Sequence, residues 1–103
     1  MIFLPKEDKL MMFYGKECPE CEVVRERLER LREEEDIEVK EYEVWHDSNN
    51  QSLMMKYAEE RCIGVPFLFN KETNEYICGP SSYEKIKKWA EGEELGEEVK
   101  EWE

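Results

Sequence analysis

The chain has 103 residues, the length of one domain built around a single hydrophobic core. Hydrophobic residues make up 40% of it and charged residues 41%, which favours a globular protein with a strongly hydrated surface. The formal net charge of -12 argues against nucleic acid as a partner, because phosphate binding needs clustered lysine and arginine. Its apolar runs are far shorter than the roughly 20 residues of a membrane span, so no membrane partner is expected.

The two ends of the chain differ from its middle. Residues 91–103 hold seven glutamates and one lysine, which is half of the net charge. We therefore predict a folded domain over residues 1–90, with an N-terminal extension at residues 1–8 and an acidic C-terminal tail at residues 91–103. The N-terminal segment has no cleavage pattern of small residues, and positions 6–9 are all charged. A signal peptide is therefore not expected, and a cytoplasmic location is the default.

The start of the domain predicts a strand followed by a long helix. The apolar run Leu10–Tyr14 is typical of a strand buried on both faces, and Gly15 closes it. Pro19 suits the first position of a helix, and apolar residues then recur with helical spacing. These apolar residues are Val23, Val24, Leu28 and Leu31. We expect the helix to end at residues 33–36, where four acids would meet the negative end of the helix dipole.

A second strand and a second helix are expected next. The alternation of apolar residues changes register near Lys40, so we start the regular strand there and end it at Trp45. The polar residues 47–49 are candidate N-caps for a helix over roughly Asn50–Arg61. Its apolar side would be formed by Leu53, Met54, Tyr57 and Ala58.

Two short strands should follow and form a hairpin. Val65–Phe69 predicts a buried third strand, with Pro66 near its beginning, where a missing N–H does least harm. Residues 70–74 indicate a turn, and Glu75–Cys78 is short enough to be the hairpin partner of the third strand.

A last helix closes the predicted domain. Ser81 and Glu84 match the S-x-x-E pattern of a capping box, in which the two side chains satisfy free N–H groups at a helix start. The helix should run to about Ala90, with Ile86 and Trp89 facing the core.

The turn between the first strand and the first helix carries the chemistry. The segment Cys18–Cys21 reads Cys-Pro-Glu-Cys, a CxxC motif. A helix N-terminus stabilises negative charge, so we expect the pKa of the Cys18 thiol to lie below the value of about 8.5 for a free thiol. Cys18 is therefore the candidate nucleophile for disulfide exchange. Cys21, one turn later, is placed to attack the mixed disulfide that Cys18 forms and to release the substrate.

The order strand, helix, strand, helix, strand, strand, helix, with CxxC at the first turn, resembles that of the thioredoxin/glutaredoxin superfamily. The matching residues are Phe13–Cys21, then Gly64-Val65-Pro66, and Gly79 after the fourth strand; the resemblance spans about residues 9–90. It implies an α/β thioredoxin-like fold, a four-stranded mixed sheet flanked by three helices. It also implies thiol-disulfide oxidoreductase activity and a role in electron transport.

The same resemblance suggests where a substrate would bind. In relatives, the residue before the proline of the third strand offers its backbone to an extended substrate chain, and the proline is cis. The resemblance gives these roles to Val65 and Pro66, and it adds Lys16 and Gly79 as substrate-binding candidates. The implied partners are a disulfide-containing protein substrate and a thiol reductant or reductase, with no bound cofactor and no metal.

Two other functions remain open. A glutaredoxin would use glutathione, for which Ser81 and Ser82 would have to hold the glutamyl end. Pro80 stands where such relatives carry a second glycine, so a protein-disulfide reductase is the first choice and a glutathione-dependent enzyme the second. A third possible function is a non-catalytic binding module that binds a basic partner through its acidic tail. The intact CxxC argues against this function.

Cys62 and Cys78 require a separate argument. If the third strand runs antiparallel to the first, it begins at the end of the sheet where the CxxC lies, and the fourth strand returns there. A second disulfide between Cys62 and Cys78 is then an option, but we favour two small buried hydrophobic residues. One CxxC with two distant cysteines makes a poor tetrahedral zinc site, even with His46 as a further ligand.

Overall fold

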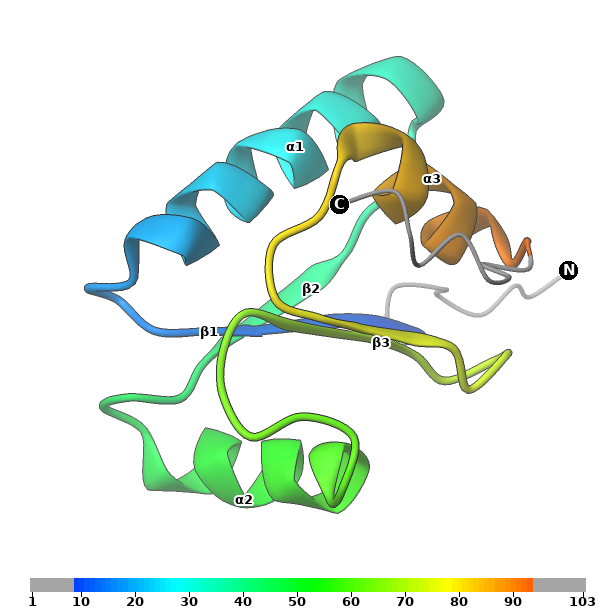
Figure 1. The fold of residues 1–103 in the computed structure, drawn as a ribbon. Helices are drawn as coiled ribbons and strands as arrows, with labels where there is room; N and C mark the ends of the chain where they lie inside the picture. The colour runs from blue at the N-terminus through cyan, green and yellow to red at the C-terminus, as the bar shows by residue number, and fades with distance from the viewer. Residues whose placement is uncertain (1–8, 94–103) are drawn as a thin grey trace, which may run out of the picture.

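The computed structural model describes residues 9–93 of the chain. Four strands form one mixed sheet in the order β2-β1-β3-β4, and three helices flank it (Figure 1). The elements are β1 Leu10–Tyr14, α1 Pro19–Glu35, β2 Lys40–Glu43, α2 Ser48–Ala58, β3 Phe67–Asn70, β4 Tyr76–Cys78 and α3 Tyr83–Glu91. The predicted architecture, a four-stranded mixed sheet flanked by three helices, is confirmed.

The sheet pairing places particular strand ends together. β1 pairs in parallel with β2 and antiparallel with β3, and β3 pairs antiparallel with β4. β3 therefore starts at the end of the sheet where β1 finishes, as the reasoning about the cysteines assumed. One row across the sheet joins Phe13, Phe67 and Cys78 in register. The end of β4 thus lies two strands away from the end of β1.

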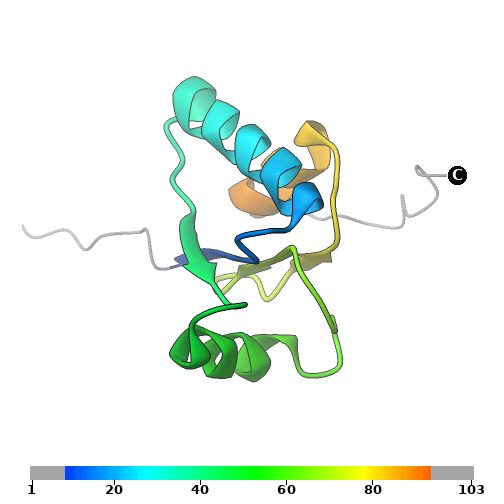
Figure 2. The ribbon, with the colours of Figure 1, turned by 90° about the vertical axis from the view of Figure 1, so that its left-hand side faces the viewer.

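The core has two layers, one on each face of the sheet. Helices α1 and α3 cover one face and α2 covers the other, which is clearest when the molecule is turned (Figure 2). β1 contributes to both layers, with Met12 on the side of α1 and α3 and Met11 and Phe13 on the side of α2. The prediction that the first strand is buried on both faces is confirmed. Trp89 and Ile86 are fully buried in the layer under α3, also as predicted.

Helix α1 ends within the acidic run at residues 33–36, as predicted. It continues to Glu35, and Asp36 caps it in a left-handed conformation with φ 59°. Arg30 pairs with Glu34 at 3.0 Å within the helix, and Lys87 of α3 pairs with Glu35 at 3.0 Å. These cations offset the unfavourable interaction between the acids and the helix dipole.

Other boundaries also differ from the sequence-based expectations. β2 ends at Glu43 rather than Trp45, and α2 spans Ser48–Ala58 rather than roughly Asn50–Arg61, with Asp47 as its N-cap. β3 begins after Pro66, since a residue without an N–H cannot donate to the sheet.

The cap of α3 is Ser82 and not Ser81. The Ser82 hydroxyl accepts the backbone N–H of Lys85 at 3.2 Å. The neighbouring Ser81 instead offers its carbonyl oxygen to Arg27 of α1 at 2.6 Å. The expected capping box from Ser81 to Glu84 was therefore wrong by one residue at its first position.

The predicted terminal segments fall largely outside the described residues. The N-terminal extension at residues 1–8 and residues 94–103 of the acidic tail are not described. Of the expected tail, Glu91 belongs to α3 and Gly92 caps that helix with φ 81°. Among residues 9–93, no helix is long and apolar enough to cross a membrane.

Candidate functional site at the first strand-to-helix turn

Cys18 occupies the N-cap of α1, immediately after the turn that leaves β1. Its backbone N–H donates to the carbonyl oxygen of Gly15 at 3.1 Å, and its sulfur accepts the backbone N–H of Cys21 at 3.1 Å. Pro19 follows at the first helical position, which needs no N–H. The sulfur of Cys18 therefore sits against the exposed N–H groups of a 17-residue helix.

Cys18 and Cys21 form a disulfide. Their Cα atoms are 5.2 Å apart, within the range that disulfides normally span. Cys18 keeps 5% of its surface exposed and Cys21 keeps 1%. Both residues are thus buried, and Cys18 at the helix start keeps the larger exposed fraction.

The segment before β3 lies at the same end of the sheet as the CxxC. The Val65–Pro66 peptide is cis, and Pro66 is fully buried. The Pro66 carbonyl oxygen accepts the backbone N–H of Gly79 at 2.8 Å. Val65 packs against both core layers, which places it at the margin of the sheet. The antiparallel pairing therefore brings Val65, Pro66 and Gly79 toward the end of β1 that leads to Cys18.

Lys16 contributes to this region through its backbone. Its N–H donates to a carboxylate oxygen of Glu43 at 2.9 Å, and its side chain is exposed. The same carboxylate accepts the backbone N–H of His46 at 2.9 Å and the Nδ1 of its ring at 2.9 Å, while the other ring nitrogen lies 3.3 Å from Glu17. Glu43 and His46 thus link the end of β2 to the turn that precedes Cys18.

Glu43 holds its charge strongly. Partial burial acts to raise the pKa of this carboxyl, but hydrogen bonds from the His46 ring and from the backbone N–H groups of His46 and Lys16 outweigh it and lower the pKa to about 2. Glu43 was not among the site residues predicted from the sequence. Its contacts depend on the parallel register that sets Tyr14 beside Glu43, and no local pattern reveals that register.

An apolar groove adjoins the site on the side of α2. Trp45 is 48% exposed, and its ring lies so close to Gly15 that a side chain at that position would overlap it. From Trp45 the groove extends past Met55 and Ile63 to Val65, with a volume of about 410 Å³. Large apolar side chains are therefore exposed beside the turn that carries the CxxC.

The remaining two cysteines form a second disulfide. Cys62 and Cys78 have their Cα atoms 5.5 Å apart. The expectation of two separate buried hydrophobic residues was wrong, because the alternation along β4 turns Ile77 toward α1 and α3 and leaves Cys78 on the side of α2, where Cys62 lies. Within residues 9–93, no group of three or more His, Cys, Asp and Glu side chains is arranged to hold a metal ion.

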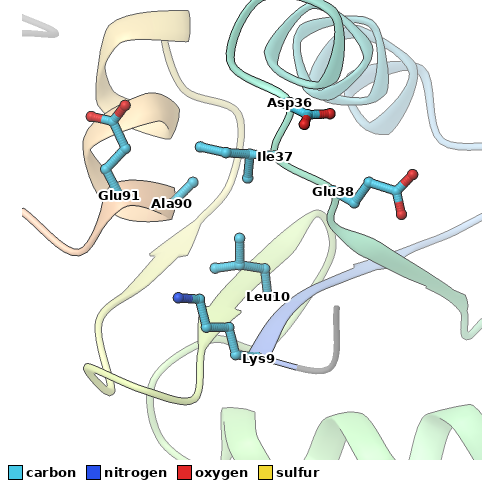
Figure 3. Close-up of a pocket in the computed structure, with 7 residues that line it drawn as sticks. All are labelled: Lys9, Leu10, Asp36, Ile37, Glu38, Ala90 and Glu91. Carbon is cyan, nitrogen blue, oxygen red and sulfur yellow. The ribbon is translucent and has the colours of Figure 1, made fainter. Parts of the chain in front are cut away.

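A second hollow of about 390 Å³ lies at the opposite end of β1 (Figure 3). Lys9 and Leu10 line it at the start of β1, facing Ile37 and Glu38 before β2 and Glu91 at the end of α3. Because Cys18 follows the other end of β1, this hollow is separate from the candidate site.

Comparisons with known proteins address the fold. No protein-family profile matches the chain, and no curated protein matches it. Among solved structures, it is similar to the crystal structure of a point mutant of the thioredoxin-like protein BC3987, with a TM-score of 0.62 and 19% sequence identity. The match covers 82% of this chain and 97% of that chain. The chain therefore has a thioredoxin-like fold, with a CxxC disulfide at the start of its first helix.

Proposed function

We propose that the protein is a thiol-disulfide oxidoreductase in which Cys18 is the nucleophile and Cys21 the resolving thiol. The observation that carries this proposal is the position of the Cys18 sulfur, which caps α1 and accepts the Cys21 N–H while bonded to the Cys21 sulfur. A thiolate at that position is stabilised by the helix N-terminus. The partner needed to close a disulfide is one helical turn away.

The reaction follows from this arrangement. In the reduced protein, the Cys18 thiolate attacks one sulfur of a substrate disulfide, and the other substrate sulfur leaves as a thiolate that takes up a proton. Cys21 then loses its proton and attacks the Cys18 sulfur, which releases the second substrate thiol. Two electrons have passed to the substrate, and the protein is left with the Cys18–Cys21 disulfide. An external thiol reductant or reductase must supply the two electrons that restore the dithiol.

The substrate we propose is an extended segment of a disulfide-containing protein. Val65 would pair with it through its backbone, beside Pro66, and Gly79 and Lys16 would complete the surface around the sulfurs. The support for this is their common location at the end of the sheet where the CxxC lies. The exposed Trp45 next to Gly15 supplies an apolar surface on which such a segment can pack.

The experiment compares the wild-type chain with Cys18→Ser and Cys21→Ser in the reduction of a protein disulfide. We expect Cys18→Ser to abolish reduction and Cys21→Ser to accumulate a mixed disulfide between Cys18 and the substrate, visible by mass spectrometry. Exposed Glu38→Gln, at the opposite end of the sheet from the CxxC, is the control and should reduce the substrate at the wild-type rate. Reduction that survives Cys18→Ser would overturn the proposal.

The electron donor is tested in the same assay. Recycling by a dithiol-dependent reductase, with little turnover on glutathione alone, is the outcome that agrees with our first choice. Efficient recycling by glutathione would replace it with the glutaredoxin alternative. A chain that binds partners without reducing them would instead be a binding module.

A further inference from the structure

The loop between α2 and β3, residues 59–66, is held to the rest of the protein at few points. At its start, the Arg61 guanidinium lies over the rings of Phe69 and Tyr76, 5.4 and 5.8 Å from their centres. At its end, Val65 packs against both core layers and the Pro66 carbonyl oxygen accepts the Gly79 N–H. In between, Ile63 is 100% exposed, so its side chain gives the loop no anchor.

The Cys62–Cys78 disulfide links this loop covalently to β4. Cys62 is 6% exposed and belongs to the core layer under α2, whereas Cys78 is exposed on β4, the edge strand of the sheet. The bond joins the loop that leads into Val65 to the strand that leads into Gly79. Both segments belong to the surface around the CxxC.

The two cysteine residues differ in exposure, which indicates the side from which the bond can be opened. Cys78 is an exposed residue on the edge strand, which favours attack there by a thiolate from solution, and accessible disulfides are the more readily reduced ones. The Cys62 sulfur lies 3.2 Å from the carbonyl oxygen of Gly64, which is ready to accept a hydrogen bond from a thiol. The reduced state therefore leaves no buried donor without a partner.

We propose that Cys62–Cys78 is a second, reversibly reducible site that controls the loop carrying Val65. A dithiol reductant attacks the Cys78 sulfur, and Cys62 leaves as a thiolate and takes up a proton. The second thiol of the reductant then attacks the mixed disulfide, so that the reductant becomes a disulfide and the protein gains two thiols. Oxidised, the pair clamps the loop beside the CxxC; reduced, it frees residues 62–65 between their two remaining anchors.

The functional consequence rests on the proposed oxidoreductase activity. Val65 contacts both core layers, so movement of the loop changes the backbone that we assign to the substrate. Cys18 and Cys21 lie at the start of α1, which the loop does not carry. Opening the second disulfide should therefore weaken substrate binding and leave the sulfur exchange itself largely intact.

The first test measures the redox behaviour of the pair alone. In Cys18→Ser/Cys21→Ala, Cys62 and Cys78 are the cysteines that remain. The variant is equilibrated without denaturant in mixtures of reduced and oxidised dithiothreitol, and free thiols are labelled and counted by mass. We expect two thiols to appear together and to disappear when the mixture is made oxidising. If the variant folds poorly, peptide mapping of the wild-type chain measures the thiol state of Cys62 and Cys78 instead. A pair that becomes reducible only in denaturant would overturn the proposal.

The second test measures the loop. Hydrogen exchange of the amides at residues 62–65 should be about tenfold faster in Cys62→Ala/Cys78→Ala than in the wild type, with β1 amides as the internal reference. Ile63→Ala changes the same loop without touching the bond and is the matched control. In protein-disulfide reduction, the double variant should raise KM several-fold and change kcat little. Unchanged exchange at these amides would refute the clamp, even with reductase activity intact. Absence of activity in the wild type would refute the proposed function and leave the exchange and titration results standing.

Discussion

Removing the Cys62–Cys78 cross-link should lower stability by an amount that the structure allows to be calculated. The two residues are 16 apart in sequence. Closing a loop of about 16 residues removes roughly 10 cal/mol/K of chain entropy from the unfolded state, so the bond contributes about 3 kcal/mol at 25 °C. A domain of this size shifts its Tm by about 4–8 °C per kcal/mol, and Cys62→Ala/Cys78→Ala should therefore melt roughly 12–24 °C below the wild type.

The other disulfide provides a matched comparison. Cys18 and Cys21 are 3 apart in sequence, and because loop entropy grows with the logarithm of loop length, their bond should contribute about 1.5 kcal/mol less. Serine at position 18 keeps an oxygen that can cap α1. Alanine at position 21 removes one buried sulfur, as alanine does at Cys62. Cys18→Ser/Cys21→Ala should therefore be the more stable of the two double variants by about 1.5 kcal/mol.

The assay is urea unfolding at 25 °C under oxidising conditions, followed by circular dichroism. Wild type, Cys62→Ala/Cys78→Ala and Cys18→Ser/Cys21→Ala are compared, and the slopes are checked because a cross-link also changes the unfolded chain. A Cys62→Ala/Cys78→Ala variant as stable as the wild type, or more stable than its counterpart, would show that the bond does not close the loop as described.

Three further predictions concern other residues. Glu43→Gln should flatten the pH dependence of the free energy of unfolding. The pKa of Glu43 is lowered from 4.5 to about 2, so its stabilising contribution is present above pH 4.5 and is lost as the pH falls toward 2. Urea unfolding between pH 7 and pH 2 will measure this loss. Asn70→Ala should cost about 2–4 kcal/mol in the same assay at pH 7, because the fully buried amide donates to the Trp89 carbonyl at 3.0 Å and its oxygen accepts two turn N–H groups. Gly15→Ala should displace the Trp45 ring and shift its fluorescence toward longer wavelength, and an unchanged spectrum would contradict the packing described.

Local patterns were sufficient for the elements whose residues interact with their own neighbours in sequence. The apolar run Leu10–Tyr14 marked a strand buried on both faces, and Pro19 marked the start of α1. The cap position of Cys18 followed from these two, because a strand that ends at Gly15 and a helix that begins at Pro19 leave only a short turn between them. The location of the candidate nucleophile was thus predictable from the sequence.

The errors arose where distant residues meet. Asn70 was assigned to a turn, yet it is fully buried and bonded to Trp89, 19 residues away. The pairing of Cys62 with Cys78 depends on which face of β4 each residue takes. Sequence spacing alone could not determine that face for so short a strand.

The candidate site shows why such distant ties matter for function. Three irregular segments converge on the end of the sheet, and each is fastened by an interaction with an element remote in sequence. Glu43 holds the turn before Cys18, the bond to Cys78 holds the loop before Val65, and Arg27 of α1 donates to the Ser81 carbonyl in the segment after β4.

These three ties differ in how they can be released. The carboxylate releases only in acid, since the pKa of Glu43 is about 2. The Arg27 tie is a hydrogen bond to a backbone carbonyl, which no redox reagent changes. The disulfide alone responds to the kind of reagent that the proposed enzyme exchanges. A dithiol reductant that reduces Cys18 and Cys21 would also act on Cys62–Cys78 by attack at Cys78, which is exposed on the edge strand. Electron supply and substrate binding would then be coupled within one small domain, through a tie that lies outside the CxxC.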